Sequence, residues 1–169
     1  KNLQTLDSLT IDNVTMCQGG YVRLCGGISA CKTLTSLSLK HLDLCDGVLS
    51  LKNHERLHSL TIDNVTMCKN GYELLFGGIS TCKTLTSLSL KDLDLCDGIL
   101  SWKNIERLHS LTIDNVTMCE DGYELLCGGI STCKTLISLS LKHLDLGDGI
   151  LILKNRNRLW SLTIDNVTM

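Results

Sequence analysis

Ten cysteines, five histidines and four Asn-Val-Thr tripeptides are the parts of this chain that could take part in chemistry. Cysteines can form disulfides or bind zinc, and histidines can bind metals or act as bases. An Asn-Val-Thr tripeptide is an acceptor for an N-linked glycan in a secreted protein. The tripeptides begin at Asn13, Asn64, Asn115 and Asn166. Which of these reactions is available depends on the elements that position the residues.

The sequence repeats itself every 51 residues. The string LTIDNVTM begins at Leu9, Leu60, Leu111 and Leu162. Three copies result, with a partial fourth, over residues 6–56, 57–107, 108–158 and 159–169. The first and second copies differ at 11 positions and the second and third at 10. A strict period is typical of repeat arrays, so we expect one array over residues 1–169. We also expect it to be a fragment of a longer protein, because neither end carries a polar capping repeat.

Each copy contains two lines with the same leucine pattern, such as LHSLTIDNVTM from Leu57 and LTSLSLKDLDL from Leu85. The copy therefore divides into units of 28 and 23 residues. Within a line, apolar Leu60 and Ile62 alternate with polar residues, which predicts a β-strand with one buried face. Seven such strands should stack into one parallel sheet. Their lines begin at Leu6, Leu34, Leu57, Leu85, Leu108, Leu136 and Leu159.

The segment after the longer unit's strand predicts a helix. Its apolar residues lie three and four positions apart, on one helical face, at Tyr72, Leu75, Phe76 and Ile79. The pair Gly77 and Gly78 predicts that the helix stops there. The shorter connection, CDGILSWKNIER, has room for a turn or two, and we expect it to be irregular or 3₁₀-like.

The template L-x-x-L-x-L-x-x-L-x-L, joined to the segment GYELLFGGISTCKTL, resembles the ribonuclease-inhibitor class of leucine-rich repeats. That class also forms the C-terminal part of nucleotide-binding leucine-rich-repeat immune receptors. The resemblance covers the whole chain and implies an α/β solenoid, a curved horseshoe. The parallel sheet would line its concave face, with short helices and irregular segments on its convex face. Val65 or Leu93 replaces the usual Asn or Cys of the template, which predicts slightly looser bends.

Comparison between the copies argues against a required role for the cysteines. Cys25 and Cys127 correspond to Phe76, and Cys96 corresponds to Gly147, so these positions do not need sulfur. Five cysteines would form a column along the array, namely Cys17, Cys45, Cys68, Cys96 and Cys119. Disulfides along that column are conceivable, but nothing selects which neighbours pair, and we favour reduced thiols. No CxxC or paired histidine spacing supports zinc, and we expect no cofactor.

Glycosylation and reduced cysteines imply opposite compartments. The four tripeptides would lie on one edge of the sheet, two strands or roughly 10 Å apart, where full-size glycans would crowd each other. We therefore favour a cytoplasmic protein, with an extracellular, glycosylated one as the alternative.

No constellation predicts catalysis. His41 and His143 share one position and His58 and His109 another, and at least one strand lies between the members of each pair. Asp92 replaces His41 in the next copy, which indicates a solvated edge rather than a base or a metal ligand. The sequence also lacks an activated nucleophile signature and a phosphate-binding glycine motif. We expect a protein that is not an enzyme.

The outward strand positions predict a small, polar face. Two columns of Ser and Thr run across the strands, beside a column of alternating charge that we call the charge ladder. Its members are Asp12, Lys40, Asp63, Lys91, Asp114, Lys142 and Asp165. Alternating charge favours the predicted register over a slip of one strand. Protein-binding surfaces usually contain large aromatic residues, so we predict a contact rim elsewhere, at His58, His109 and Trp160.

Net charge and hydropathy limit the classes of partner that this chain could bind. The formal net charge is −2, which does not favour nucleic acid, and no apolar stretch is long enough to insert into a membrane. We expect a protein partner, bound by a recognition array in a receptor-like protein. The alternative is a structural array that assembles with itself end to end, possible for near-identical copies with open ends.

Overall fold

The computed structural model describes residues 5–44, 46–52, 54–95, 107–146, 153 and 158–168. Three helices of equal length occur at equivalent places in the three copies: α1 (Gln18–Ala30), α2 (Lys69–Thr81) and α3 (Glu120–Thr132). The strands are β1 (Ser8–Asp12), β2 (Ser36–Asp43), β3 (Ser59–Thr66), β4 (Ser87–Leu95), β5 (Ser110–Met118), β6 (Ser138–Asp145) and β7 (Ser161–Thr168).

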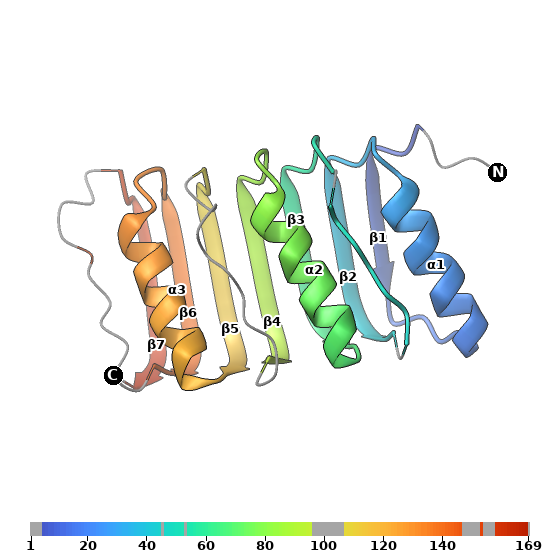
Figure 1. Ribbon diagram of the computed structural model, residues 1–169. Coiled ribbons are helices and arrows are strands. Elements are labelled where there is room, and N and C mark those ends of the chain that lie inside the picture. Colours follow the sequence, from blue (N-terminus) through green and yellow to red (C-terminus); the bar gives the residue numbers. More distant parts are fainter. Residues whose placement is uncertain are drawn as a thin grey trace.

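The seven strands form one parallel sheet in sequence order, from β1 to β7. This confirms the prediction of seven stacked parallel strands. The three helices lie on the same face of the sheet (Figure 1). We call the opposite face of the sheet the open face. The protein is thus an α/β structure with a helical layer and an open strand layer.

The register of the sheet repeats from strand to strand. Each strand pairs with the next through the same template positions, so that Ser59 faces Ser87 and Leu60 faces Leu88. At the charge ladder, Asp63 is paired with Lys40 on one side and Lys91 on the other. The same alternation continues from Asp12 in β1 to Asp165 in β7. Every described neighbour pair in the ladder therefore joins unlike charges.

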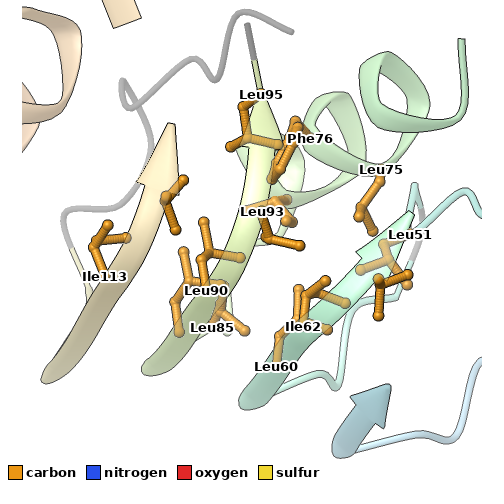
Figure 2. Close-up of a cluster of buried hydrophobic side chains, with 14 of the residues drawn as sticks. Leu51, Leu60, Ile62, Leu75, Phe76, Leu85, Leu90, Leu93, Leu95 and Ile113 are labelled. Atoms are coloured by element: carbon orange, nitrogen blue, oxygen red, sulfur yellow. The ribbon is translucent and has the colours of Figure 1, made fainter. Parts of the chain in front are cut away.

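A single hydrophobic cluster fills the space between the sheet and the helices. The inward strand residues Leu60 and Ile62 are fully buried, whereas the outward Ser59 and Thr61 are half-buried. Figure 2 shows Leu75 and Phe76 of α2 extending toward the strand side chains. The predicted helical face is buried as a whole, so its position is confirmed; it comprises Tyr72, Leu75, Phe76 and Ile79.

The prediction that the pair Gly77 and Gly78 ends the helix was wrong. Helix α2 continues through Gly77 and Gly78 to Thr81. A Cβ atom on Gly78 would lie 2.8 Å from the backbone nitrogen of Leu51, so glycine allows the helix to approach that connecting segment. A Cβ on Gly77 would meet nothing within 4 Å. The pair marks a close backbone contact, which spacing along the sequence does not reveal.

The tyrosines of the helices also anchor the strand ends, a role that sequence reasoning missed. Each tyrosine hydroxyl donates a hydrogen bond to a carbonyl seven residues earlier, at 2.8 to 3.0 Å; the pairs are Tyr21 with Val14, Tyr72 with Val65 and Tyr123 with Val116. Burial raises the pKa of Tyr72, because a phenolate is poorly solvated there. A polar tip on a buried ring thus satisfies a backbone carbonyl in every copy.

The shorter connection is irregular where it is described. Residues 46–52 and 54–56 contain turns and no helix, as predicted. The equivalent segment of the second copy, residues 96–106, and its Trp102 lie outside the described residues.

Candidate functional site

The predicted contact residues belong to one continuous row at the edge where the strands begin. Backbone bonds of 2.7 to 2.9 Å join each member to the next, and we call this set the rim row: Asp7, Thr35, His58, Thr86, His109, Ile137 and Trp160. His58, His109 and Trp160 are all exposed. One intervening residue separates His58 from His109, and another separates His109 from Trp160. The three residues are therefore on one edge of the sheet and not in direct succession.

The end of the rim row that lies nearest β7 is apolar. Trp160 is 88% exposed and Ile137, its neighbour in the row, is 43% exposed. The backbone nitrogen of Trp160 donates to the carbonyl of Ile137 at 2.8 Å. Sequence reasoning missed Ile137, although the signal was present: Thr35 and Thr86 hold the same position in the other copies. Two exposed apolar residues therefore lie side by side where the copies diverge.

The opposite end of the rim row has a different character. Asp7 and Thr35 occupy the positions that Trp160 and Ile137 hold in the last strands. The imidazole of His58 is bonded through Nδ1 to the carbonyl oxygen of Arg56 at 2.6 Å, which orients the ring. The row thus changes from polar to apolar along the array.

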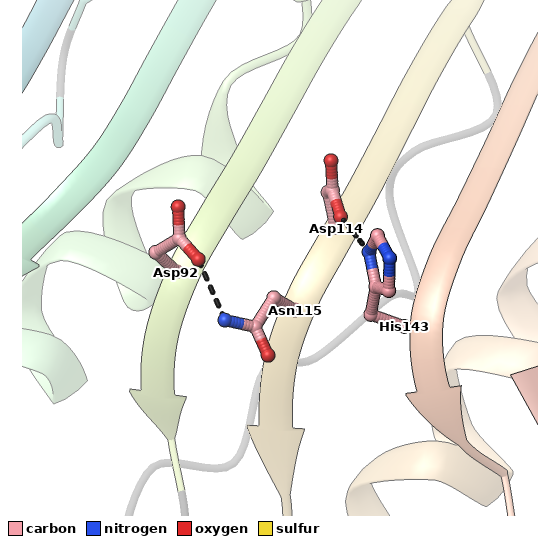
Figure 3. Close-up of polar contacts among 4 residues, drawn as sticks. All are labelled: Asp92, Asp114, Asn115 and His143. Atoms are coloured by element: carbon pink, nitrogen blue, oxygen red, sulfur yellow. Dashed lines mark hydrogen bonds and ion pairs between the residues drawn. The ribbon is translucent and has the colours of Figure 1, made fainter. Parts of the chain in front are cut away.

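The polar side chains of the open face bond to one another across the strands. The histidine Nδ1 atoms of His41 and His143 lie 2.8 Å from the carboxylates of Asp12 and Asp114, respectively. These contacts were not predicted, because the sequence indicates only that His41 and His143 lie at a solvated edge; both residues are exposed there. Figure 3 shows His143 turned toward Asp114 and the amide of Asn115 turned toward Asp92.

The asparagines of the tripeptides have a backbone role that explains their repetition. Each strand bends at one residue with φ between 48° and 52°: Asn13, His41, Asn64, Asp92, Asn115, His143 and Asn166. Asn, Asp and His are the non-glycine residues that best tolerate this left-handed conformation. All four asparagines are exposed. The side-chain nitrogen of Asn115, the atom that would carry a glycan, donates to Asp92 at 2.6 Å. Bend geometry is thus sufficient reason for an asparagine at the first position of the tripeptide.

A shallow depression of 710 Å³ lies on the open face over β4 to β7. It is lined mainly by polar residues: Asp92, Asp114, Asn115, His143, Leu144, Asp145, Asn166 and Thr168. Within the described ranges, no group of three or more His, Cys, Asp or Glu side chains is arranged to hold a metal ion. In the same part of the chain, no helix is long and apolar enough to cross a membrane.

One histidine is buried, and the sequence did not single it out. His54 is 2% exposed, and its Nε2 lies 3.1 Å from the carbonyl of Ile28. Ile105 and Arg156 hold the same position in the second and third copies, so the position does not require a histidine. His54 therefore packs in the core, with one polar contact.

The cysteines separate into two environments. Cys17, Cys68 and Cys119, from the predicted column, are free thiols at the residue before each helix, and Cys17 is exposed. Cys25 and Cys127 are buried in the core, at the position of Phe76. Burial raises the pKa of both of these thiols, because a thiolate is poorly solvated in an apolar environment. Cys45 and Cys96 lie outside the described residues.

We expect Cys17 to react with iodoacetamide at pH 8 much faster than Cys25 or Cys127. The raised pKa keeps the two buried thiols neutral, and the core blocks access to them. Because folding raises the pKa of these two thiols, the folded state holds them in the protonated form. Their contribution to the free energy of unfolding is therefore present at neutral pH and is lost as the pH rises through the folded pKa. Mass spectrometry of peptides from alkylated native protein would measure the order. The same reaction in urea, where all thiols should react alike, is the control; equal reactivity without urea would contradict the prediction.

Comparison with models of known protein families gives no match, and comparison with curated proteins gives none either.

Proposed function

We propose that this chain is a non-catalytic protein-recognition array, a leucine-rich-repeat solenoid of the ribonuclease-inhibitor class within a receptor-like protein. The observation that carries the proposal is the apolar pair Ile137 and Trp160 at the end of the rim row, 43% and 88% exposed. An exposed tryptophan beside a second apolar residue is typical of an interaction site, because burying such residues contributes most of the binding energy in many interfaces.

The repeat architecture supports the leucine-rich-repeat interpretation. Parallel strands with a helix after every second strand on one face, together with leucines at fixed inward positions, agree with the resemblance in the sequence. Free thiols at Cys17, Cys68 and Cys119 favour a cytoplasmic location.

The alternative function, a self-assembling structural array, has one observation in its favour. Leu162 and Ile164 of β7 point to the core side of the sheet but are 48% and 43% exposed. A further strand could cover them. Stacking of β7 on β1 of a second copy, however, would place Asp165 opposite Asp12, since both strands carry the same template residues. We therefore place recognition first.

A photo-cross-linker at position 160 tests the recognition role. Trp160 is replaced by p-benzoylphenylalanine in the full chain, which is then irradiated in an extract of the cells that produce the protein. We expect one discrete cross-linked protein. An excess of unmodified chain should compete for it, and an excess of Trp160→Ala chain should compete about thirtyfold less well, because removal of an aromatic anchor typically costs ~2 kcal/mol or more.

The same cross-linker at Glu73, an exposed residue of α2, is the matched control and should not give that product. A product of twice the chain's mass would favour the self-assembling alternative. No product from position 160, or the same product from both positions, would contradict the proposal.

A further inference from the structure

A cavity of 370 Å³ lies between the short connection of the first copy and the end of helix α2. Its volume is within the range of sites that hold small molecules. The connection and the end of the helix contribute polar groups to its wall: Lys52, His54, Glu55, Thr81, Lys83 and Thr84. The cavity is thus formed where one copy of the repeat meets the next.

His54 lines this cavity, is 2% exposed, and has a ring nitrogen without a hydrogen-bond partner. Its other nitrogen, Nε2, lies 3.1 Å from the carbonyl oxygen of Ile28. A carbonyl oxygen only accepts hydrogen bonds, so Nε2 carries the hydrogen. In the neutral ring, Nδ1 then has a free lone pair, to which no described residue donates. A buried acceptor without a donor is unfavourable, and a donor from a ligand would relieve it.

The contacts of His54 indicate the side from which that donor would approach. Ile28 belongs to α1, so Nε2 points toward that helix. The thiol of Cys82, the residue after α2, donates to the carbonyl oxygen of His54 at 3.4 Å. His54 therefore lies between the ends of the two helices. Because the two nitrogens of an imidazole point in nearly opposite directions, Nδ1 is directed away from α1, toward the cavity at the end of α2.

The charged residues of the cavity wall favour an anion. Lys52 and Lys83 contribute two positive charges, against one negative charge from Glu55. Both lysines are exposed, so their ammonium groups can adjust to a ligand. An ammonium group binds a carboxylate or a phosphate through charge-assisted hydrogen bonds.

The threonines of the wall offer acceptors to a ligand. The hydroxyl of Thr81 donates to the carbonyl oxygen of Gly78 at 2.9 Å, and that of Thr84 donates to the carbonyl oxygen of Leu57 at 2.8 Å. With their hydrogens engaged, the two hydroxyl oxygens can only accept a further bond. Together with Nδ1, they favour a ligand that carries hydroxyl donors.

We propose that this cavity binds a small anion that carries hydroxyl groups, such as a sugar phosphate or a sugar acid. Its anionic group would bind Lys52 and Lys83, and one of its hydroxyls would donate to Nδ1 of His54. Further hydroxyls would donate to Thr81 and Thr84. The second copy has Ile105 at the position of His54, and an isoleucine cannot accept a hydrogen bond. The site is therefore specific to the junction of the first and second copies.

Isothermal titration calorimetry with the full chain tests the proposal. The probes are glucose 6-phosphate and gluconate, at pH 8, above the range in which an unperturbed histidine gains its proton. We expect saturable binding of at least one probe, and the stronger one identifies the preferred anionic group. Sulfate and acetate, which lack a hydroxyl, and glucose, which lacks the charge, should each bind roughly fivefold more weakly or worse.

Two variants separate the roles of the histidine and the lysine. His54→Ile introduces the residue of the second copy and should weaken binding of the hydroxylated anion roughly fivefold, with sulfate and acetate unaffected. Lys83→Gln, at an exposed position, should weaken binding of every anion. The matched control is Lys134→Gln, at the equivalent residue of the third copy, which should bind as wild type does.

Three results would overturn the proposal: no binding of either probe, equal effects of Lys83→Gln and Lys134→Gln, or an unchanged preference for hydroxylated anions in the His54→Ile chain. The last result would mean that something other than the ligand, such as a water molecule, satisfies Nδ1. The Trp160→Ala chain should bind the probes as wild type does, so this site and the recognition role are tested separately.

Discussion

Replacement of Leu111 by alanine is expected to lower the free energy of unfolding by roughly 2 to 5 kcal/mol. Leu111 is an inward residue of β5, is 1% exposed, and is paired with Leu88 and Leu139 on the neighbouring strands. Truncation removes its apolar contacts and leaves a cavity in the centre of the array. Urea denaturation followed by circular dichroism would measure the change.

The matched control for Leu111→Ala is Thr112→Ala, at the next residue of the same strand. Thr112 lies on the open face and is half-buried, so the substitution should change the free energy of unfolding by only about 0.5 kcal/mol. Similar losses for the two variants would mean that the inward and outward positions have been assigned incorrectly.

Replacement of Gly78 by alanine is expected to destabilise the protein by about 1 to 3 kcal/mol, although alanine is the better helix former. The new Cβ would lie 2.8 to 2.9 Å from backbone atoms of Leu51, so the helix or the connecting segment would have to move. A backbone neighbour cannot rotate away as a flexible side chain can. Thermal and urea unfolding would both report the loss.

Gly77→Ala, one residue earlier in α2, should have the opposite effect. Nothing lies within 4 Å of its added Cβ, so the gain in helix propensity, roughly 0.5 to 1 kcal/mol, should appear as increased stability. If Gly78→Ala also stabilised the protein, the close approach of α2 to Leu51 would be incorrect.

The strands and their register could be predicted because they depend on local alternation repeated many times. Leu60 and Ile62 specify the buried face of one strand, and the 51-residue period transfers that assignment to other strands. The helical face of α2 was predictable for the same reason, since its apolar spacing is contained within 13 residues. Periodicity of this kind is the strongest structural signal in a sequence.

The contacts that join different repeats could not be predicted from spacing. Gly78 fits against Leu51, and His143 bonds to Asp114, a residue 29 positions earlier. Neither contact follows from a rule about neighbours in sequence. Ile137 beside Trp160 is a different case, because the pair follows from the predicted register between β6 and β7 together with two departures from the repeat. That pair was open to prediction and was overlooked.

The charge ladder contains only two kinds of strand, those with Asp and those with Lys, and this limits how much of the strand order it can specify. It distinguishes an Asp strand from a Lys strand, but it cannot distinguish β3 from β5, which carry identical residues over SLTIDNVT. Exchange of one for the other preserves every cross-strand pair type. Loss or duplication of one whole 51-residue block inside the array would therefore keep every cross-strand pair unlike in charge, whereas loss of a single internal strand unit would bring like charges together. By this reasoning, the interior of the array can change length without like-charge pairs only in whole blocks.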